Sequence, residues 1–545
     1  MLRIEPRSPQ AVQGLLVGSR VIFSDPPAKV RYQIDRIAVC LRVDSTPGEG
    51  RQMESLRSLK MVCIVAGFCF ATAATAHAQT LTYGQLNGKA GGNPTAAPVQ
   101  GLNGNLYGTT GSGGTSGFGA IYELTPDGRY LKIYNFCSQT NCSDGKYPAS
   151  LILAANGNFY GMTEGGGSNN NATCNNDGCG TVFEITPAGR LITLYNFCSQ
   201  ANCSDGAIPF GSLVQGINGN FYGTTFYGGI HCPTCGTVFE ITPSGQLTTL
   251  HSFCSHCNDG YQPQAGLVLA NDGNFYGTTS QGGPSNNGIV FKMSPSGAGS
   301  ILHYFCSQTN CEDGWGPEAP LTQGTDGNLY GTTAGGGAVL EGVAFQLTLG
   351  GTFTTLHAFC SQVNCADGQI PFAPLVQAND GNFYGTTTGG AALGNIFEMT
   401  PDGTVTTLYN FCDTGYPCVD GYEPMSGLTQ HTNGIFYGST DFGGINNRTL
   451  CPDPGCGTIY SLSTGLGPLI ISNPGFAKVG HEINILGSNL TGTTSVTFNG
   501  TPATDLTVTN TYIKATVPTG ATTGIVQVTT PNGVLSTNQA FQVLP

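Results

Sequence analysis

The cysteines are the residues of this chain whose spacing most directly suggests chemistry. Eighteen of the 21 cysteines follow residue 78, and all eighteen fall into close pairs. Locally paired cysteines in even number are typical of disulfide frameworks in exported proteins. We therefore predict nine short-loop disulfides: Cys137/Cys142, Cys174/Cys179, Cys198/Cys203, Cys232/Cys235, Cys254/Cys257, Cys306/Cys311, Cys360/Cys365, Cys412/Cys418 and Cys451/Cys456. Each would stabilise the fold by only about 2 kcal/mol, because the loops it closes are short. They would staple loops without being the source of the fold.

Four of these cysteines also match a zinc-binding pattern. Cys232-x2-Cys235 is followed, after 18 residues, by Cys254-x2-Cys257, which is the spacing of a zinc ribbon. Most of the other pairs are separated by four residues, and zinc does not explain that spacing. Disulfides are favoured, and zinc at these four positions stays the alternative.

A second set of polar residues recurs as Asp-Gly in one loop of the chain. Its members are Asp144, Asp205, Asp259, Asp313, Asp367 and Asp420. Carboxylates on one face could bind calcium or a cationic ligand, although Asp-Gly is also a common turn former and the turn is favoured. The only tryptophan, Trp315, lies beside Asp313 and could stack on a sugar ring. We take Trp315, Asp313, Asp259 and Asp367 as the candidate ligand face.

Nothing in the sequence predicts a catalytic site. The histidines in the repeats, such as His251, His303 and His357, occupy a place that sister segments fill with tyrosine, which favours packing over catalysis. No set of nucleophile, base and orienting residue is suggested, and no Gly-rich phosphate loop follows a strand. We predict no catalytic residue, no cofactor and no bound metal.

The N-terminal region predicts export. Residues 53–78 contain a basic start, an apolar run from Met61 to Phe70 and the small-residue site Ala76-His77-Ala78, which together are typical of a secretory signal peptide cleaved near Ala78. Residues 1–52 are interpreted as a disordered extension of the reading frame. A membrane helix over 61–76 is the alternative, but it is shorter than a span needs. We expect a secreted or cell-envelope protein without an integral membrane segment after cleavage.

The charge of the exported part excludes some partners. Residues 79–545 contain 9 Lys and Arg against 26 Asp and Glu, hence a net charge of −17. So acidic a surface repels phosphates, and we expect no nucleic acid partner.

These residues must be positioned by a repeat. Tyr-Gly followed by two small residues occurs seven times, at tyrosines 53, 62, 54, 54, 54 and 53 residues apart: Tyr107, Tyr160, Tyr222, Tyr276, Tyr330, Tyr384 and Tyr437. Such a period indicates supersecondary units that bury their apolar faces against neighbours. In one unit, alternation and turn residues predict strands over 211–217, 220–226, 236–242 and 246–253. Seven units of four antiparallel strands predict a seven-bladed β-propeller over 79–464.

The two ends of the repeat region support a closed ring. The seventh unit supplies three strands, at about 424–430, 435–441 and 457–462, and then reaches a Gly-rich linker. Residues 80–86 resemble the missing fourth strand, so we predict that this N-terminal strand closes the last blade. An open solenoid is the alternative, which would need capping repeats instead.

The units resemble the GloVer tandem repeat of exported bacterial proteins of the choice-of-anchor type. The resemblance is carried by GNFYGTT, a GG-containing loop, GTVFEITPSG and TTLHSF, and it covers residues 81 to about 463. It implies a propeller-like array, and it brings no established activity or catalytic position.

The remaining residues, 465–545, resemble an IPT/TIG domain, an immunoglobulin-like β-sandwich. Runs such as SVTFNG and GIVQVTT, broken by Gly and Pro, independently predict sandwich strands. Such domains in exported bacterial proteins usually act as stalks or adhesion modules.

We expect a non-enzymatic binding or scaffold protein, whose propeller face contacts a glycan or a protein partner at the cell surface. An extracellular polysaccharide lyase or glycosidase that uses the central pocket is the alternative, and a purely structural envelope protein is a third hypothesis. Catalysis would require asymmetric acid and base residues in one or two repeats.

Overall fold

The computed structural model describes residues 80–85, 92–94, 96–255, 258–444 and 456–545. The predicted signal peptide and the extension before it lie outside these residues. The described chain is all-β, with short 3-10 turns at Thr140–Cys142, Ala172–Cys174, Ala201–Cys203, Thr309–Cys311 and Val363–Cys365. Among the described residues no helix is long and apolar enough to cross a membrane.

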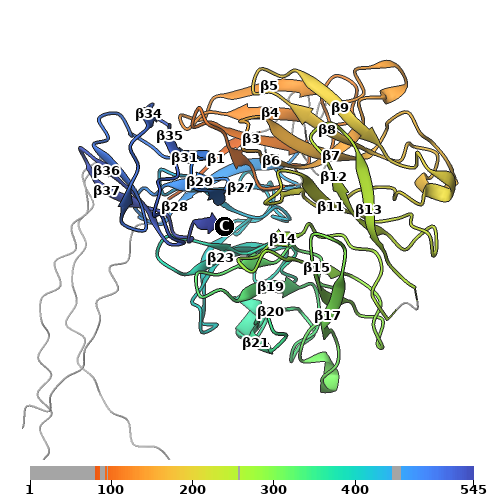
Figure 1. The fold of residues 1–545 in the computed structure, drawn as a ribbon. Coiled ribbons are helices and arrows are strands. Elements are labelled where there is room, and N and C mark those ends of the chain that lie inside the picture. The colour runs from red at the N-terminus through yellow and green to blue at the C-terminus, as the bar shows by residue number, and fades with distance from the viewer. Residues whose placement is uncertain (1–79, 86–91, 95, 256–257, 445–455) are drawn as a thin grey trace, which may run out of the picture. The chain divides into compact units, whose positions relative to one another are not determined.

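The repeats fold into seven four-stranded antiparallel sheets like propeller blades, which we number 1 to 7 in chain order. Figure 1 shows neighbouring sheets side by side, for example β7 and β8 beside β11 and β12. Their strands are β2 Val99–Gln100, β3 Leu106–Thr110, β4 Ala120–Leu124, β5 Tyr130–Asn135; β6 Lys146–Leu153, β7 Phe159–Gly165, β8 Thr181–Ile185, β9 Leu191–Asn196; β10 Val214–Gln215, β11 Phe221–Thr225, β12 Thr237–Ile241, β13 Leu247–Ser252; β14 Val268–Leu269, β15 Phe275–Thr279, β16 Ile289–Met293, β17 Gly299–Tyr304; β18 Thr322–Gln323, β19 Leu329–Thr333, β20 Val343–Leu347, β21 Phe353–Ala358; β22 Val376–Gln377, β23 Phe383–Thr387, β24 Asn395–Met399, β25 Val405–Asn410; β26 Thr429–Gln430, β27 Phe436–Thr440, β28 Thr458–Ser463 and β1 Thr80–Gln85.

The first strand of most sheets is shorter than the sequence predicts. In sheet 3 only Val214–Gln215 pairs with β11, whereas 211–217 was the expected range. The residues before the pair leave the sheet and line a cavity described below.

The Tyr-Gly pair has a separate packing reason for each residue. The tyrosine packs on the next sheet: the ring of Tyr160 lies 4.1 Å from that of Phe221, and the ring of Tyr384 lies 4.3 Å from that of Phe436, centroid to centroid. The glycine leaves room for the aromatic ring on the third strand of its own sheet, because a Cβ at Gly223 would stand 2.7 Å from the Phe239 ring.

In sheets 1, 3, 5 and 6 the threonine that follows the glycine donates to a carbonyl of the next sheet, whereas sheet 2 has Met162 there and the Thr278 hydroxyl of sheet 4 has no partner among the described residues. The Thr224 hydroxyl of sheet 3 donates to the Ala265 carbonyl of sheet 4 at 2.9 Å, and Thr386 of sheet 6 donates to the Pro424 carbonyl of sheet 7 at 2.9 Å. In sheet 7 a serine takes this place, and Ser439 donates to the Pro94 carbonyl before sheet 1 at 3.4 Å. Sheets 1 and 7 are therefore hydrogen-bonded neighbours.

The fourth strand of sheet 7 comes from the other end of the repeat region. β1 pairs antiparallel with β28, in the register Thr80↔Ser463 to Gln85↔Thr458. Sheet 7 therefore consists of β26, β27, β28 and β1.

The C-terminal residues form a β-sandwich around its own core, which contains Ile485, Val496, Phe498, Ile513 and Val528. One sheet has the order β29-β31-β35-β34, the other β33-β32-β36-β37, and β30 pairs parallel with β38. The strands are β29 Ile471–Asn473, β30 Phe476–Lys478, β31 Glu482–Leu486, β32 Ser495–Phe498, β33 Thr501–Pro502, β34 Leu506–Val508, β35 Tyr512–Thr516, β36 Val526–Thr530, β37 Gly533–Ser536 and β38 Gln542–Leu544.

The sandwich contacts the repeat sheets where their first strands end. The Asn538 side chain donates to the Gln377 carbonyl at 2.9 Å, and the Thr511 hydroxyl donates to the Leu102 carbonyl at 2.7 Å. Each of these first strands starts near the cavity described next and ends near the sandwich.

Candidate binding site

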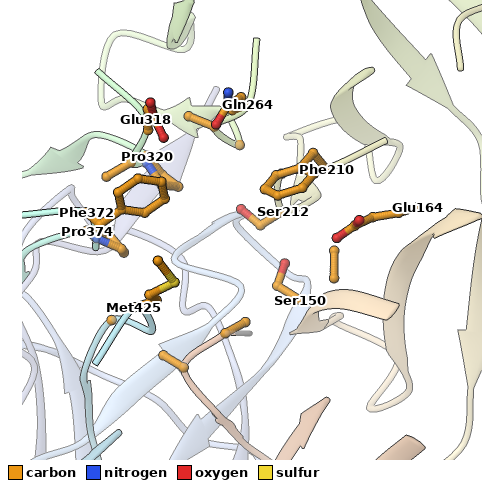
Figure 2. A pocket seen from close by; sticks show the side chains of 18 of the residues that line it. Ser150, Glu164, Phe210, Ser212, Gln264, Glu318, Pro320, Phe372, Pro374 and Met425 are labelled. Carbon is orange, nitrogen blue, oxygen red and sulfur yellow. The ribbon is translucent and has the colours of Figure 1, made fainter. Parts of the chain in front are cut away.

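A cavity of about 270 Å3, open to solvent on one side, is lined by residues from all seven repeats. Figure 2 shows Phe210 and Ser212 on one side of it, Phe372 and Pro320 across from them, and Glu318 beside Gln264. We call this cavity the funnel.

Two positions of the repeat place these side chains. The first is the residue after a proline that precedes the first strand, or in sheet 2 lies within it: Ala149, Phe210, Gln264, Glu318, Phe372 and Met425 line the funnel from there. The second is the fourth residue after the anchor tyrosine, which supplies Glu164 and Asp441. The first position lies before the first strand of its sheet, or within it at Ala149, and the second lies at the end of the second strand.

The funnel residues differ between repeats although the frame around them does not. The anchor tyrosine and its glycine recur in all seven repeats, yet the residue after the proline changes from alanine to phenylalanine, glutamine, glutamate and methionine. Packing on neighbouring sheets explains the constant residues. Packing does not explain why the residues that line the funnel differ in chemical group between most of the repeats.

The acidic groups of the funnel are held in apolar surroundings. Burial raises the pKa of Glu164 to about 7, and burial also raises the pKa of Glu318. Burial raises the pKa of Asp441 as well, and the nearby Glu423 carboxylate adds to the rise. Among the described residues, the carboxylates of Glu164 and Glu318 have no hydrogen-bond or ion-pair partner in the protein.

The rest of the wall combines aromatic and neutral polar groups. Phe210 is 43% exposed and Phe372 is half-buried, so both rings are open to a ligand. The Gln264 amide supplies a donor and an acceptor, and the Ser150 hydroxyl has no hydrogen-bond partner within the described residues. Apolar rings with a few polar groups are typical of small-ligand sites.

Two of the four candidate ligand-face residues, Asp313 and Asp367, hold a loop in place. Asp313 and Asp367 are fully buried. The Asp313 carboxylate accepts from the Ser307 amide at 3.0 Å and from the Ser307 hydroxyl at 2.7 Å, and Asp367 is held in the same way by Ser361. These carboxylates fix the loop that contains the disulfide, and they do not line the funnel.

Asp259 and Trp315 are more accessible. The Asp259 side chain is 22% exposed and lies 3.3 Å from His251 Nε2. Trp315 is 40% exposed and lies over Gly335, where a Cβ would be 2.1 Å from the indole ring. Neither residue lines the funnel, although Trp315 comes only three residues before Glu318.

Histidine and tyrosine replace each other between repeats because both side chains contact the aspartate of this loop. Tyr195 donates to Asp205 at 2.8 Å, and His303 Nε2 lies 3.1 Å from Asp313 in the equivalent place. Serine and histidine both contact the aspartate and not each other, so Ser307, His303 and Asp313 lack the contact between nucleophile and base that a catalytic triad needs.

Seven of the predicted cysteine pairs are joined in the structure. They are Cys137–Cys142, Cys174–Cys179, Cys198–Cys203, Cys232–Cys235, Cys306–Cys311, Cys360–Cys365 and Cys412–Cys418. In the two other predicted pairs, Cys257 and Cys451 lie outside the described ranges. Disulfides in this number are typical of oxidising compartments and indicate an extracellular protein.

Cys456 also packs in an apolar core. The residue is disulfide-bonded, and its predicted partner Cys451 lies outside the described residues. Cys456 is 8% exposed and belongs to the apolar core that Tyr122 of sheet 1 and Ile459 of sheet 7 share. The Cys456 carbonyl also accepts from the Asn93 amide at 3.0 Å. Cys456 therefore helps to join sheet 7 to the segment before sheet 1.

The cysteines of the zinc pattern lie close together. The sulfur atoms of Cys232, Cys235 and Cys254 are within 4.8 Å of one another. However, Cys232 and Cys235 form a disulfide and Cys254 is disulfide-bonded too, which occupies the thiolates that zinc would require.

The chain belongs to the Gloeobacter/Verrucomicrobia repeat family, whose model matches residues 66–271 and 232–451. Residues 469–543 match the IPT/TIG domain. No curated protein sequence matches the chain.

Several solved structures are similar in fold. The extracellular domain of BT4673 from B. thetaiotaomicron, described as part of a hybrid two component system, is 11% identical over 86% of this chain and 59% of its own, with a TM-score of 0.46. The corresponding domain of BT3049 is 12% identical over 86% of this chain and 55% of its own, with a TM-score of 0.45. The aldose sugar dehydrogenase of Streptomyces coelicolor is 12% identical over 58% of this chain and 93% of its own, with a TM-score of 0.35. The chain thus spans less than two thirds of the first two proteins.

Proposed function

We propose that this protein is a secreted or cell-surface binding protein, and that its repeat region is a closed seven-bladed propeller whose funnel holds a glycan. The contacts between sheets 1 and 7 and the pairing of β1 with β28 support the closed ring. The observation that carries the binding function is the funnel wall, where constant repeats present different side chains.

The chemistry of the wall favours a sugar over other small ligands. Phe210 and Phe372 offer apolar faces for the C–H side of a pyranose ring. Gln264, Glu164 and Glu318 offer acceptors for its hydroxyl groups, and a carboxylate is the stronger acceptor. Anionic ligands are disfavoured, because three acidic groups and, among the described residues, no basic residue line the funnel.

The export part of the proposal rests on the disulfides and on the sequence. The region up to Ala78 has the pattern of a signal peptide. The sandwich, in this proposal, is a spacer that holds the propeller away from its anchor.

A glycan array tests the proposal. Wild-type protein and the variants Phe372→Ala and Trp315→Ala are applied to the same array. We expect wild type and Trp315→Ala to bind the same glycans and Phe372→Ala to lose them. If only Trp315→Ala loses binding, the ligand lies at Trp315 and not in the funnel. If no form of the protein binds, a glycan ligand is rejected.

One observation favours a second candidate, an enzyme that cleaves a glycan in the funnel. A general acid must keep its proton near neutral pH, and burial raises the pKa of Glu164 to about 7. Release of reducing ends from the bound glycan, abolished in Glu164→Gln while binding persists, would support this candidate. Binding without any cleavage supports the first proposal.

A further inference from the structure

A second cavity lies between sheets 3 and 4, away from the funnel. Its volume is about 320 Å3, and its wall includes His251, Phe253, Phe291, Met293 and Ile301. The first residue of the outer strand of sheet 4, Gly299, also borders it.

The cavity exists because of that glycine. Gly299 pairs with Met293 at the start of β17. The residues with the same pairing in the other described sheets that follow this pattern all have side chains: Tyr130, Leu191, Leu247, Phe353 and Val405. Sheet 4 therefore lacks the side chain that fills the space against the preceding sheet.

The next interface shows what fits this space. Between sheets 4 and 5, the Phe353 ring stacks on His303 with centroids 3.9 Å apart and planes 8° apart. The same ring is 5.0 Å from Phe345 and 5.9 Å from Phe305. At the interface of sheets 3 and 4, the residues equivalent to these three partners are His251, Phe291 and Phe253, which are the aromatic walls of the cavity.

Side-chain exposure reflects the missing ring. The His251 side chain is 37% exposed, whereas that of His303, covered by Phe353, is 11% exposed. Phe291 is 6% exposed, whereas Phe345 is completely buried. An imidazole and an aromatic face are thus open to a ligand at one interface and covered by the protein itself at the next.

We propose that this cavity binds a small molecule through a flat aromatic ring of about the size of a phenyl group. The ring would stack on His251 and contact Phe253 and Phe291, as the Phe353 side chain does one sheet further on. His251 and Asp259, 3.3 Å apart, offer a polar partner to a substituent on the ring. This site is independent of the funnel and of any glycan.

Toluene is the appropriate probe, since it reproduces the side chain of Phe353. Ligand-observed NMR on the secreted protein, residues 79–545, should detect toluene binding with a Kd on the order of 1 mM, as expected for a ligand of this size. Methylcyclohexane, which has the same carbon skeleton but neither a flat ring nor a π face, should bind at least several-fold more weakly.

Two variants decide whether the cavity is responsible. Gly299→Phe should fold, because Phe353 occupies the same register in sheet 5, and it should weaken toluene binding at least tenfold. Phe353→Gly should create a second cavity and add a second toluene site. Unchanged binding in Gly299→Phe would overturn the proposal, and so would equal binding of methylcyclohexane or no binding of toluene to wild type. If Phe353→Gly does not fold, Gly299→Phe and the two probes still decide the question.

Discussion

Gln100 of sheet 1 and Thr432 of sheet 7 bind each other through two hydrogen bonds across 332 positions of the chain. The Gln100 Nε2 group donates to the Thr432 hydroxyl at 2.9 Å, and the Thr432 backbone N–H donates to Gln100 Oε1 at 3.0 Å. Both hydrogen bonds are buried. Glutamines at the same strand position join other neighbours: Gln377 accepts from the Thr325 amide, and Gln430 from the Asn379 amide. The joint between the last and first sheets therefore uses the same device as the joints within the array.

Substitution of Gln100 tests this joint. Gln100→Leu leaves the buried Thr432 amide without its acceptor, which should lower the free energy of unfolding by about 1–3 kcal/mol. Leucine itself is acceptable there, because sheets 2 and 4 have Leu153 and Leu269 at this position. Denaturant titration measures the effect. Gln215→Leu is the matched control with a smaller loss, because its partner, the Ala155 amide, is exposed. Equal losses would contradict the claim that burial of the Thr432 amide causes the larger cost.

Removal of β1 tests the origin of the fourth strand. A protein that begins at residue 87 should unfold at a lower temperature than one that begins at residue 79, because β28 loses its outer partner. The bare edge of β28 should also favour association between chains. Calorimetry and light scattering measure the two effects, and identical behaviour of both proteins would refute the role of β1.

The Tyr-Gly signature makes a steric prediction. A Cβ at Gly385 would lie 2.6 Å from the Phe397 ring, so Gly385→Ala should cost about 1–3 kcal/mol of stability. Adding Phe397→Leu should restore part of the loss, because it removes the clashing ring atoms. Gly381 provides the contrast: nothing lies within 4 Å of a Cβ there, and only its positive φ of 88° opposes alanine. If the second substitution restores nothing, the clash is not the reason for the glycine.

Glu164 makes the stability of the protein depend on pH. Its pKa rises from 4.5 to about 7 on folding, so the folded state holds the proton more tightly than the unfolded state does. The free energy of unfolding should therefore fall as the pH rises from 4.5 to 7. Glu164→Gln lacks this titration and should gain on the order of 2 kcal/mol over wild type at about pH 8, but little at about pH 4. Denaturation at both pH values measures the difference. A gain of the same size at both would mean that ionisation is not its cause.

The sequence predicts the strands well because their signals are local. Alternation and turn residues indicate β12 and β13 to within a residue or two, and the spacing of Tyr-Gly gives the number of sheets. The first strand of sheet 3, predicted over 211–217, was overestimated at its start, because Gly211 and Ser212 lie outside the strand and line the funnel. No local signal distinguishes the two uses.

The candidate site depends on contacts that no local pattern contains. Asp313 looked like a ligand because it recurs, but Asp144, Asp205, Asp313 and Asp367 are all fully buried acceptors that hold their own loop. Glu164, Glu318 and Phe372 were missed, because none of them recurs through the repeats: Glu164 and Glu318 occur once at their positions, and Phe372 is matched only by Phe210. An alignment of the seven repeats could have drawn attention to them, since two of its variable columns, the residue after the proline and the fourth residue after the anchor tyrosine, supply residues that line the funnel.

The most direct test of the account is calorimetric titration of a glycan from the array into wild type and three variants. We predict that Phe372→Ala and Glu318→Gln each weaken binding at least tenfold, as expected for loss of a stacked ring or of a charged acceptor, while Trp315→Ala leaves the Kd within twofold of wild type. Unchanged affinity in both funnel variants, with the variants folded as wild type, would contradict the claim that the funnel is the binding site.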